Sequence, residues 1–591
     1  MVNTACPKGK IWKLRPSSPH ATQLAHDIGL DPIGAQLLIN RGLSDRDPAL
    51  SFMSPRLSNL LDPMLLKDMD RAVEMVVHAL EEKKKITIYG DFDADGITST
   101  ALLVKFFWAL DIPVSYYIPD RFREGYGLHP QAIEMIAGEG TGLMITVDCG
   151  TANGGEISLA LKRGMNVVVT DHHQVPDHFE PLCPVINPQR HDSSFPFRDL
   201  AGVGVAFFLA AAVRAALRGM GWFGADQEPD LKPYLGLVAL GTVADMAPLM
   251  GQNRILVRAG LDSLIRDPGA GIRALQGVSK VETSMLTAND LAFRIAPRLN
   301  AAGRIGDPKL GVEILTTERP SLADELALKL NTMNSRRQDI ERSIFDQIEE
   351  KIMEIQDLEQ RRTLVISGRG WHRGVLGIVA SRLREKYYRP AMVLDIEDGM
   401  AVGSGRSIAG FNLYRALSEL APLLEKFGGH RYAAGFTIRA GNIDRFAGAL
   451  EGIMQSETDE EALIPTLEID ARITLPYLTE KRVRGFEVLS PFGPKNPEPL
   501  FYAGPLEVVH CRAVGENHLR WKVRQDGIVR DAIGFNLGSN HTFDQNPINM
   551  VFTPEINRWQ GFEKVQLRVV DFEVALSGES KLQMPIGLEL I

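Results

Sequence analysis

Residues 85–96, Lys-Ile-Thr-Ile-Tyr-Gly-Asp-Phe-Asp-Ala-Asp-Gly, join a short apolar run to three carboxylates at alternate positions. The apolar half has the length and the β-branched composition of a buried strand. Asp91, Asp93 and Asp95 follow it directly, and clustered carboxylates repel one another unless a positive charge lies among them. A glycine on each side of the carboxylates allows the backbone to turn and to approach a ligand closely. The stretch predicts a strand that ends at a divalent-metal site.

This stretch has two other interpretations: a solvated acidic loop and a calcium loop of the helix-loop-helix type. The calcium loop needs a preceding helix and a Glu at its twelfth position. Counted from Asp91, the twelfth position is Leu102, which excludes that loop. The solvated acidic loop stays open if residues 85–96 are considered alone.

Three further apolar runs end in groups that can bind a metal. Residues 143–147 end in Asp148-Cys149-Gly150, residues 166–170 end in Asp171-His172-His173, and residues 235–243 end in Ala244-Asp245. We expect all of these runs to be parallel strands with helices between them, which is a doubly wound α/β sheet. Ligands bind outside the carboxyl ends of the strands in such sheets. Four strand ends with metal-compatible groups are hard to explain as helix caps.

At these residues the sequence resembles the DHH phosphoesterase superfamily and, within it, the RecJ single-strand exonucleases. The resemblance covers most of the chain, from about residue 70 to about residue 575. Any one matching segment is weak support, but all of them occur in the family's order. The matching segments are residues 90–96, 146–150, 171–173, 242–245, 298–304, 371–382, 403–407 and 428–430.

The remaining segments predict further domains. Residues 324–355 lack Pro and Gly and repeat apolar residues at helical spacing, which predicts one long helix. Residues 360–456 alternate strand and helix patterns. Beyond an acidic linker, short β-rich segments with Gly, Asn and Pro turns suit an OB-fold barrel. With the resemblance, the expected domains are an N-terminal extension 1–70, a DHH catalytic domain 71–318, a connecting helix 319–358, a smaller α/β DHH-associated (DHHA1) domain 359–456 and an OB-like barrel 466–577.

The predicted metal site suits phosphodiester cleavage by two divalent ions. Carboxylates with a single imidazole favour Mn2+ or Mg2+ over zinc, and Cys149 is the only thiol in the cluster. Together with the resemblance, this assigns the metal ligands as Asp93, Asp95, Asp148, His172 and Asp245, with Asp148 bridging the ions.

Three residues at the site have roles that the sequence leaves open. Asp91 is either a further ligand or a second-shell base. His173 either binds the scissile phosphate or protonates the leaving oxygen, and Asp171 could hold a histidine ring. Many superfamily members have a histidine where this chain has Tyr89; the tyrosine resembles the RecJ branch and leaves the ligand set of the first metal open.

The resemblance also implies a set of substrate-binding residues. Arg121, in a Gly-bounded loop, is expected to clamp a phosphate. Residues 403–407 and 428–430 read as two small-residue loops, and backbone amides in such nests bind anions. In the barrel, basic residues interleave with aromatic ones, as in OB-folds that bind single strands. The full set is Arg121, Arg298, Asn300, Arg304, Ser404, Arg406, Ser407, His430 and Trp521.

Composition bounds the class of protein but not its substrate. The 591 residues carry a net charge of −9, with 45% hydrophobic and 24% charged residues, as in ordinary globular proteins. The four cysteines show no C-x-x-C pair, so neither a zinc ribbon nor a disulfide framework is indicated. We expect no secretory signal and no membrane-spanning run, and hence a cytoplasmic protein.

Together with the resemblance, which supplies the polarity and the roles in recombination and repair, the sequence predicts a single-stranded-DNA-specific 5′-to-3′ exonuclease that releases mononucleotides with two Mn2+ or Mg2+ ions. The expected partners are single-stranded DNA with a 5′ end, a single-strand-binding protein and a helicase, with no membrane, and the expected state is a monomer. Two alternatives are open: a DHH phosphodiesterase for short oligoribonucleotides or cyclic dinucleotides, and a non-catalytic binding scaffold. The barrel argues against the first, and the complete ligand set argues against the second.

Overall fold

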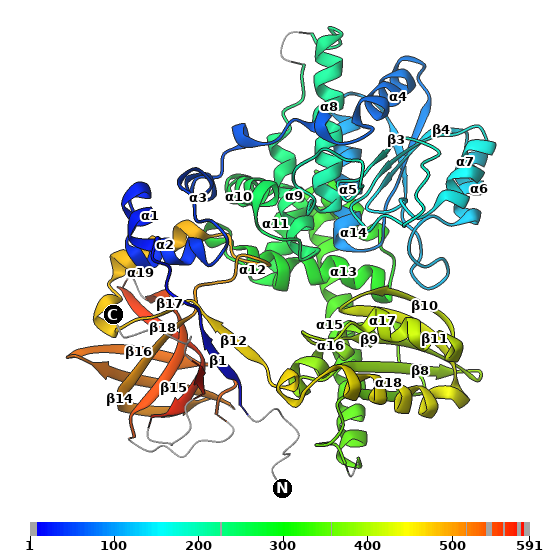
Figure 1. Cartoon of the computed structure of the whole chain (residues 1–591). Helices are drawn as coiled ribbons and strands as arrows, with labels where there is room; N and C mark the ends of the chain where they lie inside the picture. Colours follow the sequence, from blue (N-terminus) through cyan, green and yellow to red (C-terminus); the bar gives the residue numbers. More distant parts are fainter. Residues whose placement is uncertain are drawn as a thin grey trace. The chain divides into compact units, whose positions relative to one another are not determined.

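The computed structural model describes residues 9–224, 227–355, 357–515, 517–538, 546–559, 562–575 and 581–583 (Figure 1). The chain forms two compact units. The first contains Asp45–Ser335 and Val488–Glu498, and the second contains the described parts of Met1–Ser44, Arg336–Glu487 and Pro499–Ile591. We describe each unit by itself.

A five-stranded parallel sheet organises the first unit, in the order β3-β2-β4-β5-β6. Its strands are β3 (Val114–Tyr117), β2 (Lys85–Tyr89), β4 (Thr141–Val147), β5 (Asn166–Thr170) and β6 (Val185–Ile186). Ile86 and Ile145 pack on one face with the helices α4 (Met69–Glu81), α5 (Ala94–Trp108) and α8 (Gly202–Gly219). Tyr89 and Met144 pack on the other face with α6 (Pro130–Gly138) and α7 (Gly154–Lys162). The doubly wound sheet is therefore confirmed.

Helix α8 is long and apolar enough to cross a membrane, judged by length and composition alone. In this structure 67% of that stretch is buried, and residues such as Val205 and Phe208 belong to the hydrophobic core of the sheet. An apolar helix that is covered on most sides is typical of the core of a large protein.

The expected strand at residues 235–243 is wrong. These residues form helix α9 (Leu235–Ala244), buried along its whole length, and a short apolar run cannot be assigned to helix or strand by periodicity alone. Gly241 explains the close packing of α9 on α5, because a Cβ there would lie 2.2 Å from Thr98 Oγ1. Asp245 is thus the C-cap of a helix rather than the end of a strand.

Helices complete the first unit beyond the sheet. A π-helix, η5 (Leu291–Ile295), leads into α13 (Ala296–Ile305), and Gly303 of α13 lies so close to the carboxylate loop that a Cβ would be 2.3 Å from the Phe92 carbonyl oxygen. The predicted long helix is observed as α15 (Pro320–Met353). Leu326 and Leu330 belong to the core of the first unit. The later residues Ile344, Phe345 and Ile348 belong to a core of the second unit.

The second unit contains a smaller α/β sheet, in the order β10-β11-β9-β8-β7. The strands are β7 (Leu364–Gly368), β8 (Ala391–Glu397), β9 (Met400–Arg406), β10 (Leu424–His430) and β11 (Ala433–Arg439), and helix α16 (Leu376–Tyr387) connects β7 to β8. The two expected glycine loops are therefore wrong: residues 403–406 and 428–430 lie in strands β9 and β10. The glycines of β9 serve packing, since Gly403 faces the Phe436 ring and Gly405 faces Met392.

The predicted barrel closes through a sheet in the order β13-β14-β15-β16-β18-β17, with β17 also pairing with β14. Its strands are β13 (Ala471–Arg472), β14 (Phe501–Val514), β15 (His518–Gln525), β16 (Ile528–Gly534), β17 (Ile548–Trp559) and β18 (Phe562–Val574). Beside it, β1 (Ile11–Leu14) pairs in parallel with β12 (Thr466–Ile469) and with β19 (Leu582–Gln583).

Candidate metal centre and nucleic-acid site

Asp93 begins helix α5 and fixes the carboxylate loop. Its side chain is the N-cap and accepts hydrogen bonds from the backbone N–H groups of Asp95 (2.9 Å) and Gly96 (3.1 Å). Thr98, Ser99 and Thr100 follow within the first turns of α5. Those three hydroxyls donate to carbonyl oxygens one turn back, such as Ser99 Oγ to Asp95 O at 2.7 Å.

Asp95 is buried against the N-terminus of α8. Its carboxylate accepts hydrogen bonds from the N–H groups of Gly202 (2.7 Å) and Val203 (2.9 Å). Burial and the neighbouring charge of Asp93 nevertheless raise the pKa of Asp95 to about 7. The backbone at the start of α8 therefore holds the carboxylate in place.

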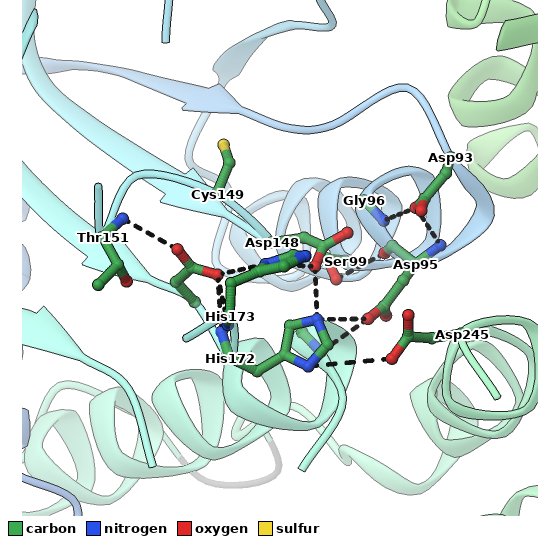
Figure 2. A network of polar contacts seen from close by, with 12 residues as sticks. Asp93, Asp95, Gly96, Ser99, Asp148, Cys149, Thr151, His172, His173 and Asp245 are labelled. Carbon is green, nitrogen blue, oxygen red and sulfur yellow. Dashed lines mark hydrogen bonds and ion pairs between the residues drawn. The ribbon is translucent and has the colours of Figure 1, made fainter. Parts of the chain in front are cut away.

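The His172 ring lies among three carboxylates that come from different elements (Figure 2). Its Nε2 is 3.0 Å from Asp148 Oδ1 and 3.8 Å from Asp95 Oδ2, and its Nδ1 is 3.9 Å from Asp245 Oδ2. Asp148 follows β4 in the left-handed conformation (φ 62°), and a Cβ on Gly202 would lie 2.7 Å from its Oδ1. The ends of β4, β5 and α9 and the start of α5 thus bring together the predicted ligands.

The electrostatics of the cluster favour a bound cation. Among the described residues, the buried atoms Asp91 Oδ1, Asp148 Oδ1 and His172 Nε2 have no hydrogen-bond partner, although His172 Nε2 and Asp148 Oδ1 lie 3.0 Å apart. Buried polar atoms are normally paired. Burial and the adjacent carboxylates raise the pKa of Asp91 and Asp148 well above the usual range, and that of Asp245 to about 9.

The donor set fits hard or borderline divalent ions. Groups of candidate ligand atoms within 4.8 Å of one another are Asp91, Asp93 and Asp148; Asp95, His172 and Asp245; and Asp148, His172 and His173. Oxygen donors with imidazole suit Mn2+ and Mg2+. Cys149 does not add a thiolate, since burial raises the pKa of its thiol well above the usual range.

This cluster predicts how the metal-free protein responds to pH. The pKa values of Asp95 and Asp245 in the folded protein, about 7 and about 9, exceed the value of about 3.9 for an unfolded Asp. Their contribution to stability is complete below about pH 4 and is lost as pH rises through about 7 and then about 9. We expect the Tm in EDTA to fall over that range, and the stabilisation by added Mn2+ to grow.

Scanning calorimetry in EDTA and in Mn2+, from pH 5 to pH 9, checks this expectation. Asp245→Asn removes the group with the higher pKa and should flatten the upper part of the EDTA curve. A stabilisation by Mn2+ that is equal at both ends of the range would show that these carboxylates do not bind the ion.

Asp171 orients the second histidine of the motif. Its buried carboxylate accepts hydrogen bonds from the N–H groups of Thr151 (2.9 Å), His172 (2.7 Å) and His173 (3.1 Å). Its Oδ1 also lies 2.8 Å from His173 Nδ1, as expected for a residue that holds a histidine ring. Burial opposes charge on both groups, but their hydrogen bond lowers the pKa of Asp171 below its usual range and raises the pKa of His173 to about 9.

Sequence reasoning missed Tyr126. Its hydroxyl lies 2.9 Å from His173 Nδ1 and 3.1 Å from the backbone carbonyl oxygen of Asp148. The available signal was a tyrosine between two glycines, and both Gly125 and Gly127 have positive φ. The sequence analysis predicts a substrate-binding role for only one residue of that loop, Arg121.

The structure brings some of the predicted substrate residues of the first unit to the carboxylates. The Arg121 guanidinium lies 4.9 Å from the centroid of the Phe92 ring; burial lowers its pKa, and Asp91 and Asp93 oppose that change. Asn300 Oδ1 accepts a hydrogen bond from Ala94 N at 2.9 Å and so holds the start of α5.

The two remaining arginines of this group belong to α13. Arg298 is bound within the helices, since it donates to Asn331 Oδ1 at 3.0 Å and to the Arg294 carbonyl. Arg304 is half-buried in the last turn of α13. Contact of either arginine with a substrate stays a prediction.

In the second unit, Ser404 and Arg406 of β9 lie beside the first turn of α16. Arg406 Nη1 donates to Gly405 O (2.8 Å) and to Ser404 Oγ (3.3 Å). A Cβ on Gly377 would lie 2.8 Å from Arg406 Nη2, so this glycine leaves room for the guanidinium. Ser407, by contrast, is buried and donates to the Phe411 carbonyl oxygen at 3.0 Å, which is a structural contact. His430 ends β10 and is exposed.

Trp521 was expected to bind the substrate, as aromatic side chains of OB-folds do by stacking on bases. This expectation is wrong, because the side chain of Trp521 is buried. Trp521 is 3% exposed and packs edge-on against Phe572 in the barrel core, with ring centroids 5.1 Å apart. Its neighbours on β15, Arg520 and Lys522, point outward because side chains alternate along a strand.

Comparisons with known proteins agree with this architecture. Models of three families match the chain: the DHH family N-terminal domain at residues 85–242, the DHHA1 domain at residues 361–456 and the RecJ OB domain at residues 469–571.

Two curated relatives are both named single-stranded-DNA-specific exonuclease RecJ. The protein of Dickeya dadantii is 39% identical over 532 residues, which are 87% of this chain and 92% of the relative. The protein of Bacillus subtilis is 35% identical over 571 residues, which are 95% of this chain and 71% of the relative. The crystal structure of RecJ from Thermus thermophilus in complex with Mn2+ matches with a TM-score of 0.81 and 29% identity, over 95% of this chain and 79% of that one. The chain therefore belongs to the RecJ family of single-stranded-DNA-specific exonucleases.

Proposed function

We propose that the protein is a metal-dependent exonuclease that degrades single-stranded DNA from the 5′ end and releases 5′-mononucleotides, in recombination and repair. The observation that carries this proposal is the cluster of buried, mutually repelling ligands at the carboxyl edge of the sheet, in a chain of the RecJ family. We assign the metal ligands as Asp93, Asp95, Asp148, His172 and Asp245.

We assign the steps of phosphodiester cleavage to the bound ions and to residues of this chain as follows. Two divalent ions bound there would activate a water and stabilise the charge that develops on the leaving oxygen. We assign the protonation of that oxygen to His173, which Asp171 holds, and the removal of a proton from the water to Asp91. Arg121 provides a guanidinium near the carboxylates for a phosphate oxygen.

A DHH phosphodiesterase for very short substrates is the second candidate. The closed barrel argues against it, because a small substrate needs no third domain with a basic face. A non-catalytic scaffold fits less well, since it would have no need of buried carboxylates that destabilise the metal-free protein.

Digestion of matched single-stranded and duplex DNA tests the proposed activity. We expect acid-soluble nucleotides from the single strand in Mn2+ or Mg2+ and none in EDTA, with little release from a blunt duplex. Equal digestion of both forms would contradict single-strand specificity, and digestion in EDTA would contradict metal dependence.

We expect the outer face of the barrel to bind the part of the single-stranded DNA that follows the cleaved end. Arg512 lies directly opposite Arg520 on the paired strands β14 and β15, and His510 lies opposite Lys522. Together with Trp521 and Asp531 they line a recess, in which Asp531 lies 3.8 Å from Arg520. Like charges directly opposite each other destabilise a sheet, so the Arg512–Arg520 pair favours a bound polyanion.

Deleting the barrel would be a poor test of that role. Arg254, in the first unit, is buried and donates to the carbonyl oxygens of Leu489 (2.8 Å), Ser490 (2.8 Å) and Val488 (3.0 Å). A chain truncated from residue 466 would lose that support, so surface substitutions replace the deletion.

The triple variant Arg512→Ala, Arg520→Ala, Lys522→Ala should bind long single strands more weakly. Three lost phosphate contacts should also reduce the slope of log Kd against log salt by about 2. Cleavage of a trinucleotide should change little. Fluorescence anisotropy over a salt series measures the slope, and Arg558→Ala, whose guanidinium pairs with Glu563 at 2.9 Å, is the control. An unchanged slope would mean that the single-stranded DNA binds to another face of the protein.

The other assignments rest on the resemblance alone. We infer a cytoplasmic monomer that acts beside a single-strand-binding protein and a helicase, with no membrane contact. Each of these statements stays a prediction.

A further inference from the structure

The hydrogen bonds of the His173 ring are concentrated on one nitrogen. Within the residues that the structure describes, the hydrogen bonds of the ring run through Nδ1, to Asp171 Oδ1 at 2.8 Å and to Tyr126 Oη at 2.9 Å. The two oxygens of the Asp171 carboxylate already accept hydrogen bonds from the backbone N–H groups of Thr151, His172 and His173, and an ionised carboxylate can only accept. Nδ1 is therefore the donor in the contact with Asp171.

The Tyr126 hydroxyl fits the same arrangement. Its single proton can go to the backbone carbonyl oxygen of Asp148, which lies 3.1 Å away and accepts only. The phenolic oxygen is then an acceptor toward His173 Nδ1. Both partners of Nδ1 are thus acceptors, and the proton stays on Nδ1 in either charge state of the ring.

Tyr89 anchors the backbone that carries Tyr126. Its buried hydroxyl donates to the Gly127 carbonyl oxygen at 3.1 Å. Tyr117, the last residue of β3, donates to Glu124 Oε1 on the same loop at 2.7 Å. The loop is therefore held on both sides of the residue that touches His173.

We propose that Tyr126 is a positioning residue for the protonation of the leaving group. Together with Asp171 it holds the proton of His173 on Nδ1 and fixes the ring, which leaves Nε2 as the nitrogen that exchanges a proton with the substrate. Tyr89 supports this role through Gly127. The inference deepens the proposed nuclease function and rests on it.

The step balances without any further reactant. The oxygen of a water bonds to phosphorus while the P–O3′ bond breaks, and the electron pair of that bond stays on O3′. His173 Nε2 gives its proton to O3′, and the ring becomes neutral with its remaining proton on Nδ1. The proton of the water passes to the Asp91 carboxylate.

A sulfur leaving group separates this role from a structural one. A strand whose first linkage carries sulfur in place of O3′ expels a thiolate, which needs no proton. In single-turnover reactions with Mn2+, Tyr126→Phe should slow the oxygen substrate by roughly three- to tenfold, the value of one neutral hydrogen bond. It should slow the sulfur substrate by less than about twofold, because no proton has to be delivered to the departing sulfur.

Two controls make the result decisive. Tyr117→Phe removes a hydroxyl of β3 that also holds this loop, through Glu124, and the variant should slow both substrates alike. The Kd of Tyr126→Phe for an uncleaved strand in EDTA should match the wild-type value. Equal slowing of both substrates by Tyr126→Phe, or no slowing of either, would overturn the proposal. A wild-type protein that cleaves neither substrate would instead contradict the proposed nuclease function.

Discussion

Asp148→Asn should lower the rate of strand cleavage by at least about a thousandfold, because the loss of a shared ligand removes several kcal/mol of charge stabilisation at about 1.4 kcal/mol per decade. Asp148 lies at the centre of the cluster, with Oδ1 3.0 Å from His172 Nε2 and without a hydrogen-bond partner. Asparagine suits the site because it tolerates the left-handed backbone at φ 62°. The fold should therefore persist without the charge.

The same substitution should make the metal-free protein more stable. Burial and the carboxylates of Asp91, Asp93 and Asp95 oppose the charge of Asp148. In EDTA we expect a higher Tm for Asp148→Asn than for the wild type, and a much smaller rise when Mn2+ is added. Asp262→Asn, on the exposed surface of α10 (Gly251–Arg266), serves as the matched control. Near-wild-type turnover by Asp148→Asn with Mn2+ present would contradict the ligand assignment.

Arg406→Ala should slow digestion of 5′-phosphorylated strands far more than digestion of strands with a 5′-hydroxyl. Arg406 and Ser404 lie beside the first turn of α16, where a Cβ on Gly377 would reach the guanidinium. Helix N-termini and guanidinium groups favour phosphate. A terminal phosphate carries more charge than an internal diester, so this arrangement suits an end rather than the middle of a strand.

The expected magnitude follows from charged hydrogen bonds, which contribute about 1.5–3 kcal/mol each. Loss of one bidentate pair should reduce kcat/KM on phosphorylated ends by roughly ten- to several hundredfold. Arg439→Ala is the control, since that exposed arginine of β11 pairs with Glu425 at 2.7 Å. Equal slowing on both kinds of end would mean that Arg406 binds the DNA strand without distinguishing a 5′-phosphate from a 5′-hydroxyl.

The strand ends of the first unit could be predicted because their patterns are local. A buried, β-rich run that is followed by Asp91, by Asp148 or by Asp171 predicts the end of a strand from neighbouring residues alone. The three strands are observed in one parallel sheet. The run before Asp245 was misassigned because a short, fully buried helix has no polar face that would show its period. The assignment of Asp245 as a metal ligand stays a prediction, and the end of a helix can present a carboxylate to the cluster as the end of a strand can.

The remaining errors concern contacts between distant segments. Gly403 and Gly405 suggested a loop, but they lie in a strand whose neighbours, Phe436 and Met392, leave no room for a side chain. Trp521 suggested a stacking surface, yet strand alternation turns it into the barrel core. The two glycines beside Tyr126 are visible in the sequence, but its contact with His173 could not be predicted, because it depends on how two separate loops fold together.

Release of nucleotides from strands labelled at one end tests the central claim most directly. A single strand with a 5′-phosphate is labelled either at that phosphate or at its last nucleotide, and both are incubated with Mn2+. We predict that the 5′ label appears at once as a mononucleotide, while the 3′ label stays in long products until late in digestion. Early release of the 3′ label as a mononucleotide, or internal fragments from both strands, would contradict a 5′-to-3′ exonuclease.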